Sequence, residues 1–193
     1  MKSINKSSVI GFVLGLIIGP VLIMGGLYVY VKLRMPDKKE MALSPPDVPS
    51  HQKVTLDWKV KALDGTEINL GEEFKDRVVF LNFWATWCPP CVAEMTSIEK
   101  LFQKFGGRIA FACISNEDIA KIRDFRGAKG WTFPMYRVEG ELPERIRTKG
   151  IPATFIISRK GSLALKHVGG ADWAHETVVT FLEDLLSDKV EQL

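Results

Sequence analysis

Two cysteines separated by two prolines constrain this chain more than any other feature. Residues 84–91 read Trp-Ala-Thr-Trp-Cys-Pro-Pro-Cys, so Cys88 and Cys91 are three positions apart. An apolar run at 78–83 precedes them and predicts a buried strand, and the segment at 92–105 predicts a helix. Thiols one helical turn apart can close a disulfide and reopen it. The junction therefore indicates redox chemistry rather than scaffolding.

The start of the helix indicates which sulfur reacts first. The first turn of a helix has N–H groups without intrahelical partners and a partial positive charge, which favours ionisation of a sulfur there. The thiolate is the nucleophile in disulfide exchange. We therefore expect Cys88, the more exposed thiol, to attack a disulfide, and Cys91, one turn inside the helix, to resolve the mixed disulfide.

Two other uses of the cysteine pair stay open at this point. A structural zinc site needs four ligands, but only Cys113 remains and no His-x3–5-His pair exists, so neither a metal nor a cofactor is expected. A permanent structural disulfide is the second alternative. Cys113 stands in an apolar strand and is expected to be a buried, inert thiol. The isolated histidines, His51, His167 and His175, are expected on the surface.

Composition excludes some classes of function. The 193 residues suit one domain with an appendage, and the net charge of +3 comes from 26 basic and 23 acidic residues that are interspersed. No basic block indicates a nucleic-acid partner. Three cysteines are too few for a disulfide-built scaffold, so the core must come from apolar burial.

The N-terminal segment predicts a membrane anchor. Residues 9–31 are uncharged, and as a helix they would span about 34 Å, compared with about 30 Å of bilayer hydrocarbon. This run is longer than a signal-peptide core of about 7–15 residues, and no small-x-small cleavage site follows it. We therefore expect an uncleaved anchor at 1–34 that contacts the membrane through residues 9–31.

The charges beside the anchor conflict with an extracytoplasmic domain. Two lysines precede the segment, whereas four basic residues follow it within 32–39. A positive-inside count would therefore place the large domain in the cytoplasm, but long domains translocate largely regardless of flanking charge.

The remaining chain divides into a linker and a folded domain. Residues 35–53 contain four prolines and are expected to be an extended linker, so the domain occupies 54–193. Its pattern predicts strands at 54–60, 67–70, 77–83, 108–115, 153–158 and 163–168. It predicts helices at 92–105, 117–128 (capped by Asn116), 141–148 and 172–186. This order predicts a three-layer α/β fold with a mixed, partly parallel central sheet flanked by helices.

Two motifs in this order resemble those of the thioredoxin superfamily. They are Phe-Trp-Ala-Thr-Trp-Cys-Pro-Pro-Cys at 83–91 and Gly-Ile-Pro-Ala-Thr-Phe at 150–155. The anchor, the Trp-x-x-Trp-Cys sequence and Glu94 make the chain similar to the membrane-anchored TlpA/ResA-like branch, over residues 54–186. The resemblance implies an extracytoplasmic thiol–disulfide oxidoreductase on the periplasmic side. Its substrates would be disulfide-bearing exported proteins, apocytochrome c among them, and a membrane electron donor would re-reduce it.

The resemblance also assigns a role to Pro152. The family places a cis proline opposite the cysteines, and Pro152 matches that position. A cis X–Pro bond costs little, and it would leave the Ile151 backbone free to pair with an extended substrate segment. Without the resemblance, the residues alone would favour an ordinary trans proline at the start of a strand.

Glu94 matches a functional glutamate of the ResA-like branch. It lies three residues after Cys91 on the same helical face, where a carboxylate could take the proton from Cys91. The alternative is a solvated acid that is favoured near a helix N-terminus by the dipole alone. Asn82 stands where thioredoxins proper carry a buried aspartate. Because an amide cannot accept a proton in that way, proton handling would fall to Glu94.

Residues around the cysteines are expected to contact substrate. Trp87, Pro89 and Pro90 would form an apolar rim together with Ile151 and Pro152, whereas Trp84 could equally belong to the core. The two prolines have no N–H to offer a Cys88 thiolate, which favours a more reducing couple.

A disulfide reductase is the leading functional hypothesis, and two alternatives stay open. One is a copper-handling protein that binds Cu(I) through the cysteine pair and a histidine such as His167, although related copper proteins space the cysteines by three. The other is a disulfide oxidase or isomerase.

Overall fold

The structure is a computed structural model that describes residues 25–26 and 53–187. The chain separates into two units, Met1–Glu40 and Met41–Leu193, and of the first unit only the helical residues 25 and 26 are described. Apart from residues 25 and 26, the predicted anchor at 9–31 therefore lies outside the described residues, as does the linker at 35–53 up to residue 52. No helix within the described residues is long and apolar enough to cross a bilayer.

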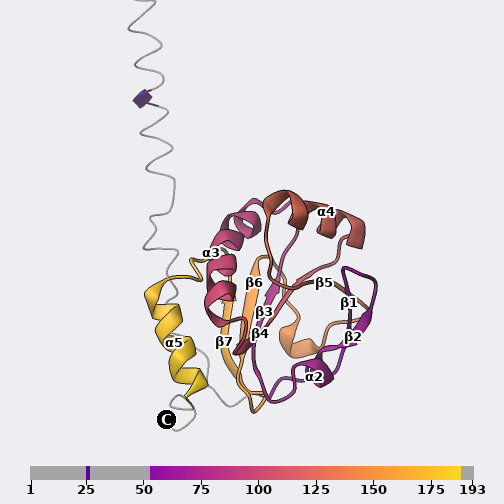
Figure 1. The fold of residues 1–193 in the computed structure, drawn as a ribbon, viewed down its shortest axis with the longest axis vertical. Coiled ribbons are helices and arrows are strands. Elements are labelled where there is room, and N and C mark those ends of the chain that lie inside the picture. Colours follow the sequence, from indigo (N-terminus) through magenta and orange to yellow (C-terminus); the bar gives the residue numbers. More distant parts are fainter. Residues whose placement is uncertain (1–24, 27–52, 188–193) are drawn as a thin grey trace, which may run out of the picture. The chain divides into compact units, whose positions relative to one another are not determined.

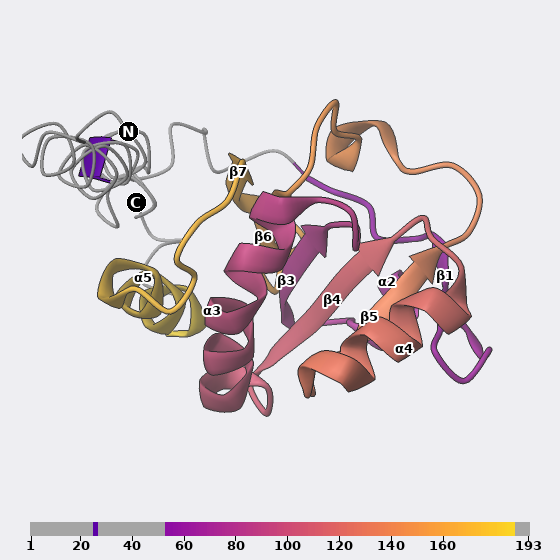
Figure 2. The same cartoon turned by 90° about the horizontal axis from the view of Figure 1, so that it is seen from above.

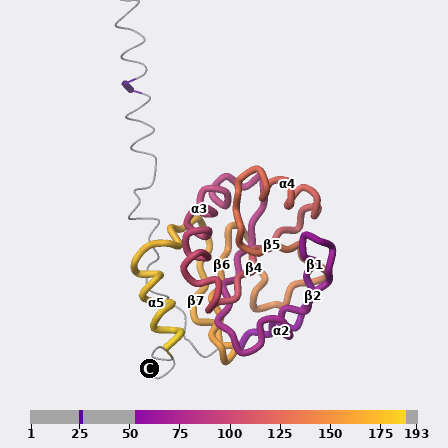
Figure 3. Tube along the Cα trace, viewed as in Figure 1, coloured from indigo at the N-terminus to yellow at the C-terminus, as the bar shows by residue number. Residues whose placement is uncertain are grey.

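A seven-stranded mixed sheet forms the centre of the described domain (Figure 1). The strands are β1 (Lys59–Ala62), β2 (Glu67–Asn69), β3 (Val78–Phe83), β4 (Ile109–Ser115), β5 (Met135–Val138), β6 (Ala153–Ile157) and β7 (Leu163–Val168). Their order across the sheet is β2-β1-β5-β4-β3-β6-β7. Figure 3 shows the path of the chain through the domain as a trace. The three central strands β3, β4 and β5 are parallel, and the outer strands join them antiparallel. The prediction of a mixed, partly parallel sheet is confirmed.

Three long helices cover one face of this sheet (Figure 2). They are α3 (Pro89–Phe105), α4 (Ile119–Lys129) and α5 (Glu176–Leu186). The other face is covered more thinly, by the four-residue helix α2 (Leu70–Glu73), the 3-10 turn η1 (Glu144–Ile146) and residues 54–58. Each face of the sheet has its own apolar cluster. The buried side of α3 belongs to the cluster on the helical face, so this helix covers the centre of the sheet there.

Several predicted boundaries are wrong because side chains or distant strands override the local pattern. The strand predicted at 54–60 begins only at Lys59, because the Val54 N–H pairs with Gly161 O and the chain then runs beneath the sheet. The strand predicted at 67–70 ends at Asn69, whose side chain accepts the N–H groups of Gly71 and Glu72 and so starts α2.

The other differences also arise at the ends of elements. Helix α4 is capped at its N-terminus by Asp118 rather than Asn116. Its C-cap is Gly130, whose φ of 69° lies in the left-handed region that glycine adopts without steric cost. Helix α5 begins at Glu176 rather than 172, because the His175 ring caps it. The helix predicted at 141–148 is only the turn η1, and strand β5 was not predicted at all.

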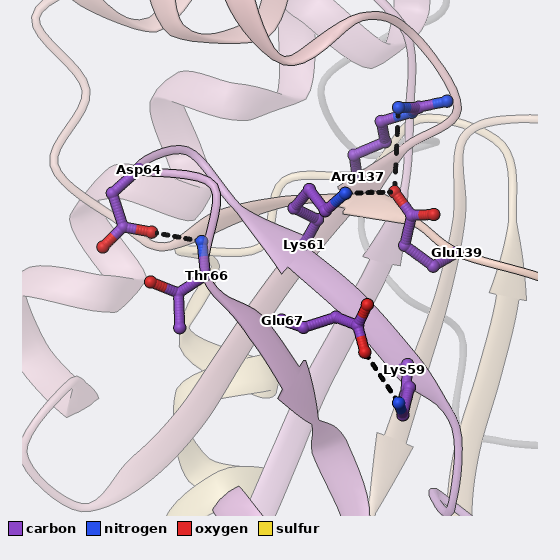
Figure 4. Close-up of polar contacts among 7 residues, drawn as sticks. All are labelled: Lys59, Lys61, Asp64, Thr66, Glu67, Arg137 and Glu139. Carbon is purple, nitrogen blue, oxygen red and sulfur yellow. Dashed lines mark hydrogen bonds and ion pairs between the residues drawn. The ribbon is translucent and has the colours of Figure 1, made fainter.

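Ion pairs link neighbouring strands at the β2 side of the sheet (Figure 4). Lys59 pairs with Glu67 across the two strands at 2.7 Å, and Glu139 lies 3.7 Å from both Lys61 and Arg137. Exposed pairs of this kind add little stability. Only Glu67 lies on the short edge strand β2, where its charge opposes pairing with another chain.

The packing of α3 gives the first prediction. Ile98 is fully buried between α3 and the sheet, so Ile98→Ala should lower the free energy of unfolding by about 2–5 kcal/mol. Lys100→Ala, on the exposed side of the same helix, should change it by less than about 0.5 kcal/mol. Urea unfolding followed by circular dichroism measures both. Equal effects from the two variants would contradict this packing.

Candidate active site

The junction between β3 and α3 places the two cysteines. Cys88 is the N-cap of α3, and its Sγ accepts the N–H of Cys91 at 3.3 Å. Pro89 and Pro90 form the first helical positions, where a missing N–H costs nothing and a fixed φ favours the helix. For this reason the helix begins at Pro89 rather than at the predicted residue 92, and both sulfurs belong to its first turn.

The two sulfurs are joined in a disulfide. The Cα atoms of Cys88 and Cys91 are 5.3 Å apart, and the structure holds the oxidised form of the pair. Cys88 is 4% exposed and Cys91 is fully buried. A reagent from solvent therefore reaches Cys88 first, which agrees with the order of reaction expected from the sequence.

The loop before β6 lies against the cysteines. The peptide bond between Ile151 and Pro152 is cis, as the resemblance implied. The carbonyl oxygen of Ile151 lies 3.8 Å from Cys88 Sγ, and the Pro152 carbonyl accepts the N–H of Gly169. Residues 63 positions apart in the chain thus meet at the sulfur that solvent can reach.

Exposed apolar side chains belong to the segments around the disulfide. Trp87, which precedes Cys88, is 67% exposed, and Val168 at the end of β7 is the other exposed large apolar residue of the described chain. Pro89 and Pro90 are also exposed. Trp84 is buried, so the alternative that places it in the core is correct.

Glu94 is buried and fully enclosed by hydrogen-bond donors. It is 1% exposed, so the alternative of a solvated acid is wrong. Its Oε1 accepts Asn82 Nδ2 at 2.8 Å, and its Oε2 accepts the N–H of Ala171 at 3.1 Å and Trp173 Nε1 at 2.9 Å. These donors come from β3 and from the loop between β7 and α5.

Burial changes the acidity of this carboxyl group. Removal from water disfavours the charged form and raises the pKa of Glu94 to about 7, although the hydrogen bonds from Trp173, Asn82 and Ala171 oppose the shift. All three donors are uncharged groups, so none supplies a positive charge to hold the carboxylate. Glu94 can therefore gain or lose a proton near neutral pH.

Asn82 links Glu94 to the strands on both sides. It lies opposite Cys113 of β4 and Thr154 of β6, and its Nδ2 also donates to Thr154 Oγ1 at 2.9 Å. Cys113 is buried, as predicted. Burial raises the pKa of its thiol well above the ordinary value, and the charge of Glu94 adds to this shift. The third cysteine is therefore an unreactive neighbour.

The two described histidines, His167 and His175, lie in different surroundings. His167 is half-buried, with its ring 5.8 Å from that of Trp173, so it lies only partly at the surface. Burial lowers the pKa of His167. His175 is exposed and caps α5, and His51 lies outside the described residues. Within 53–187 no three His, Cys, Asp or Glu side chains are grouped to hold a metal ion, so nothing there supports the copper-handling alternative.

Sequence reasoning missed the partners of Glu94. Ala171 and Trp173 lie 77 and 79 residues from it, and no local spacing connects them to the cysteine motif. The available signal was a tryptophan in a short polar loop after a strand.

A cleft of about 520 Å³ lies at the opposite end of β3 from the disulfide. None of the site residues lines it, so it plays no part in this site.

Comparisons with known proteins agree with this geometry. A family model described as Redoxin matches residues 44–182. The thioredoxin-like protein YneN of Bacillus subtilis is 32% identical over 117 residues, 58% of this chain and 68% of that protein. The thiol-disulfide oxidoreductase ResA of Halalkalibacterium halodurans is 30% identical over 131 residues, 66% of this chain and 73% of that protein.

A solved structure shares the fold. The solution structure of a Bacteroides thetaiotaomicron protein described as a disulfide isomerase superposes with a TM-score of 0.63 at 24% identity. It covers 79% of this chain and 98% of its own chain. At this level of identity, the likeness shows a thioredoxin-like fold alone.

The raised pKa of Glu94 predicts how stability depends on pH. Below about pH 4.5 the group is protonated in both states, and between pH 4.5 and about 7 the unfolded chain ionises first. The folded state therefore loses stability over this range, by about 3 kcal/mol in total. Glu94→Gln removes the titration, so its stability relative to wild type should rise by about this amount from pH 4.5 to pH 8.

Chemical denaturation at several pH values measures this difference. Glu67→Gln, which changes an exposed carboxylate, is the control and should show no comparable gain as the pH rises. A difference between Glu94→Gln and wild type that stays constant from pH 4.5 to pH 8 would contradict a carboxyl group that is buried and titrates near neutrality.

Proposed function

Because the chain belongs to the Redoxin family and is a thiol–disulfide oxidoreductase of the ResA type, we propose that it reduces disulfides in exported proteins through Cys88 and Cys91. The observation that carries this proposal is the buried Glu94 carboxyl group on the helix of the cysteines, with a pKa near 7. A purely structural disulfide would have no use for a buried proton acceptor of this kind.

The reaction proceeds in two exchanges. The Cys88 thiolate attacks one sulfur of the substrate disulfide, a mixed disulfide forms, and the first substrate thiolate leaves. The Cys91 thiolate then attacks Cys88 Sγ, the second substrate thiolate leaves, and the Cys88–Cys91 disulfide forms. Two electrons have moved from the enzyme dithiol to the substrate, and the enzyme reaches the oxidised form described above.

Glu94 serves the second exchange. A thiol must lose its proton before it attacks, and an ordinary thiol has a pKa of about 8.5. A carboxylate with a pKa near 7 is a much better match for this proton than one near 4.5, because acid–base catalysis is most efficient when the pKa lies near the working pH. Burial of Glu94 therefore makes it an effective acceptor for the proton of Cys91.

Substrate contacts come from the surface around Cys88. An extended substrate segment pairs with the Ile151 backbone, in the manner of strand addition, while Trp87, Pro89, Pro90 and the Pro152 loop receive its side chains. The 3.8 Å between Ile151 O and Cys88 Sγ supports this, because it brings a paired segment within reach of the sulfur.

The direction and place of the reaction complete the proposal. Pro89 and Pro90 lack an N–H, so less of the helix start is available to stabilise a Cys88 thiolate, which favours reduction of substrates over their oxidation. Residues 9–31 anchor the enzyme with its catalytic domain outside the cytoplasm. A dithiol-bearing membrane electron donor re-reduces it, and apocytochrome c is among its substrates. The uncharged run at 9–31 supports the anchor, and the similarity to a thiol-disulfide oxidoreductase, ResA, supports the exchange chemistry.

The cysteines give the direct test of this function. Cys88→Ser should abolish reduction of a protein disulfide, whereas Cys91→Ser should accumulate a mixed disulfide through Cys88, because the resolving thiol is absent. Cys113→Ser should retain full activity, since that thiol is buried and takes no part. Insulin reduction and non-reducing electrophoresis measure the outcomes. Turnover by Cys88→Ser would refute the assignment.

Glu94 gives a second kinetic prediction. With Glu94→Gln, resolution of the mixed disulfide should slow by about 100-fold at pH 7, because the amide cannot accept the proton. The wild-type rate should rise with a midpoint near pH 7, and the variant should lose that step. Stopped-flow measurement between pH 5 and pH 9 gives both profiles, with Glu67→Gln as control. Identical profiles for Glu94→Gln and wild type would rule out this role.

A further inference from the structure

A second buried glutamate holds the turn that precedes Cys88. Glu117 lies in the loop between β4 and α4, and its side chain is only 8% exposed. Its Oε2 accepts the backbone N–H of Thr86 at 2.6 Å, and its Oε1 accepts the Thr86 hydroxyl at 2.8 Å. One carboxylate thus binds both polar donors of Thr86.

Neighbouring groups fix this carboxylate in turn. The Ser115 hydroxyl donates to Oε2 at 3.3 Å and accepts the N–H of Glu117, while Lys121 forms an ion pair with Oε1. Burial raises the pKa of Glu117, but the bonds from Lys121 and Thr86 outweigh it and bring the pKa below its ordinary value. Glu117 is therefore an ionised acceptor, and hydrogen bonds to an ionised group are among the stronger ones.

The clamped residue stands between two tryptophans with different surroundings. Trp84 is packed in the core, whereas Trp87 is 67% exposed and its side chain gains little from packing. Beyond Thr86 the turn is held by a hydrogen bond from Cys88 N to Ala85 O at 3.2 Å. The two hydrogen bonds from Thr86 to Glu117, called the Thr86 clamp below, fix the backbone before Trp87, and the start of α3 fixes the backbone after it.

We propose that Glu117 is a positioning residue that holds Trp87 in place as a preformed platform for protein substrates. The inference rests on the proposed function and adds a determinant of substrate class. Ordering a loose aromatic side chain and its loop upon binding costs affinity, and a clamp that orders them beforehand removes that cost. A protein substrate that spans Trp87 and Cys88 gains from the clamp, whereas a small disulfide that meets only the sulfur does not.

The chain provides a chemically matched control far along α3. Glu99 accepts the N–H of Thr132 at 2.8 Å and its hydroxyl at 2.6 Å, which is the same pair of bonds in a turn that contains no site residue. Loss of that clamp removes comparable interactions without affecting the turn that carries Trp87. Glu99→Ala and Thr132→Val therefore report what a purely structural loss does.

The experiment compares two disulfides with the reduced full-length chain. Glu117→Ala and Thr86→Val should lower the second-order rate constant for insulin about tenfold, and leave that for the small disulfide dithiobis(nitrobenzoate) within about twofold of wild type. Glu99→Ala and Thr132→Val should change neither. Glu117→Gln should restore most of the insulin rate, because its amide can accept the Thr86 N–H and donate to the Thr86 hydroxyl.

A double-mutant cycle links the effect to Trp87. In a Trp87→Ala background, Glu117→Ala should cause no further loss with insulin, since the platform is already absent. Additive losses, equal losses on both disulfides, or equal losses from the Glu99→Ala control would each overturn the inference alone. A wild-type protein that reduced neither disulfide would overturn the proposed function, and this inference with it.

Discussion

The Glu94 carboxylate is the contact on which the arrangement of the site depends. It joins α3 to β3 through Asn82, and it joins α3 to the loop after β7 through Ala171 and Trp173. Ala171 and Trp173 are 77 and 79 residues away from Glu94 in the chain. A buried carboxyl without such donors would cost several kcal/mol. The three bonds make burial tolerable while leaving the charged form disfavoured. The same contact therefore orients the helix of the cysteines and produces an acid that titrates near neutral pH.

Two buried glutamates show how neighbouring groups assign different tasks to the same residue type. Glu94 is surrounded by neutral donors, so desolvation prevails and the pKa rises to about 7. Glu117 has the ammonium group of Lys121 beside it, and its pKa falls. The first is suited to moving a proton, and the second to holding a turn as a permanent anion. Both follow the cysteine pair in the chain: Glu94 lies on α3 itself, and Glu117 reaches the segment that joins β3 to α3 through its bonds to Thr86.

The centre of the site could be predicted from the sequence because its signals are local. The apolar run before Cys88 predicts strand β3, the segment after Cys91 predicts most of helix α3, and the cis bond before Pro152 followed from the resemblance. The start of α3 was predicted three residues too late, because Pro89 and Pro90 are themselves its first helical positions. Strand β5 could not be predicted, because its four residues include Arg137 and gain their stability from neighbouring strands.

The residues that hold Glu94 and the turn before Cys88 could not be predicted either, because tertiary structure brings them to the site. Two of the three partners of Glu94, Ala171 and Trp173, come from a loop whose position is set by the pairing of β6 with β7, and no spacing near the cysteines encodes that position. Glu117 was detectable in principle, since β3 and β4 are parallel and the loops after parallel strands meet at one edge of the sheet. That argument requires the sheet order, which the sequence alone left open.

The most direct test of the central claim is an NMR titration of the side-chain carboxyl carbon of Glu94 in the folded protein. A midpoint near 7 is the result that this account predicts, because burial beside neutral donors must favour the protonated form. A midpoint near 4.5 would contradict it, since the group would then be an ordinary carboxylate and a poor acceptor for the proton of Cys91.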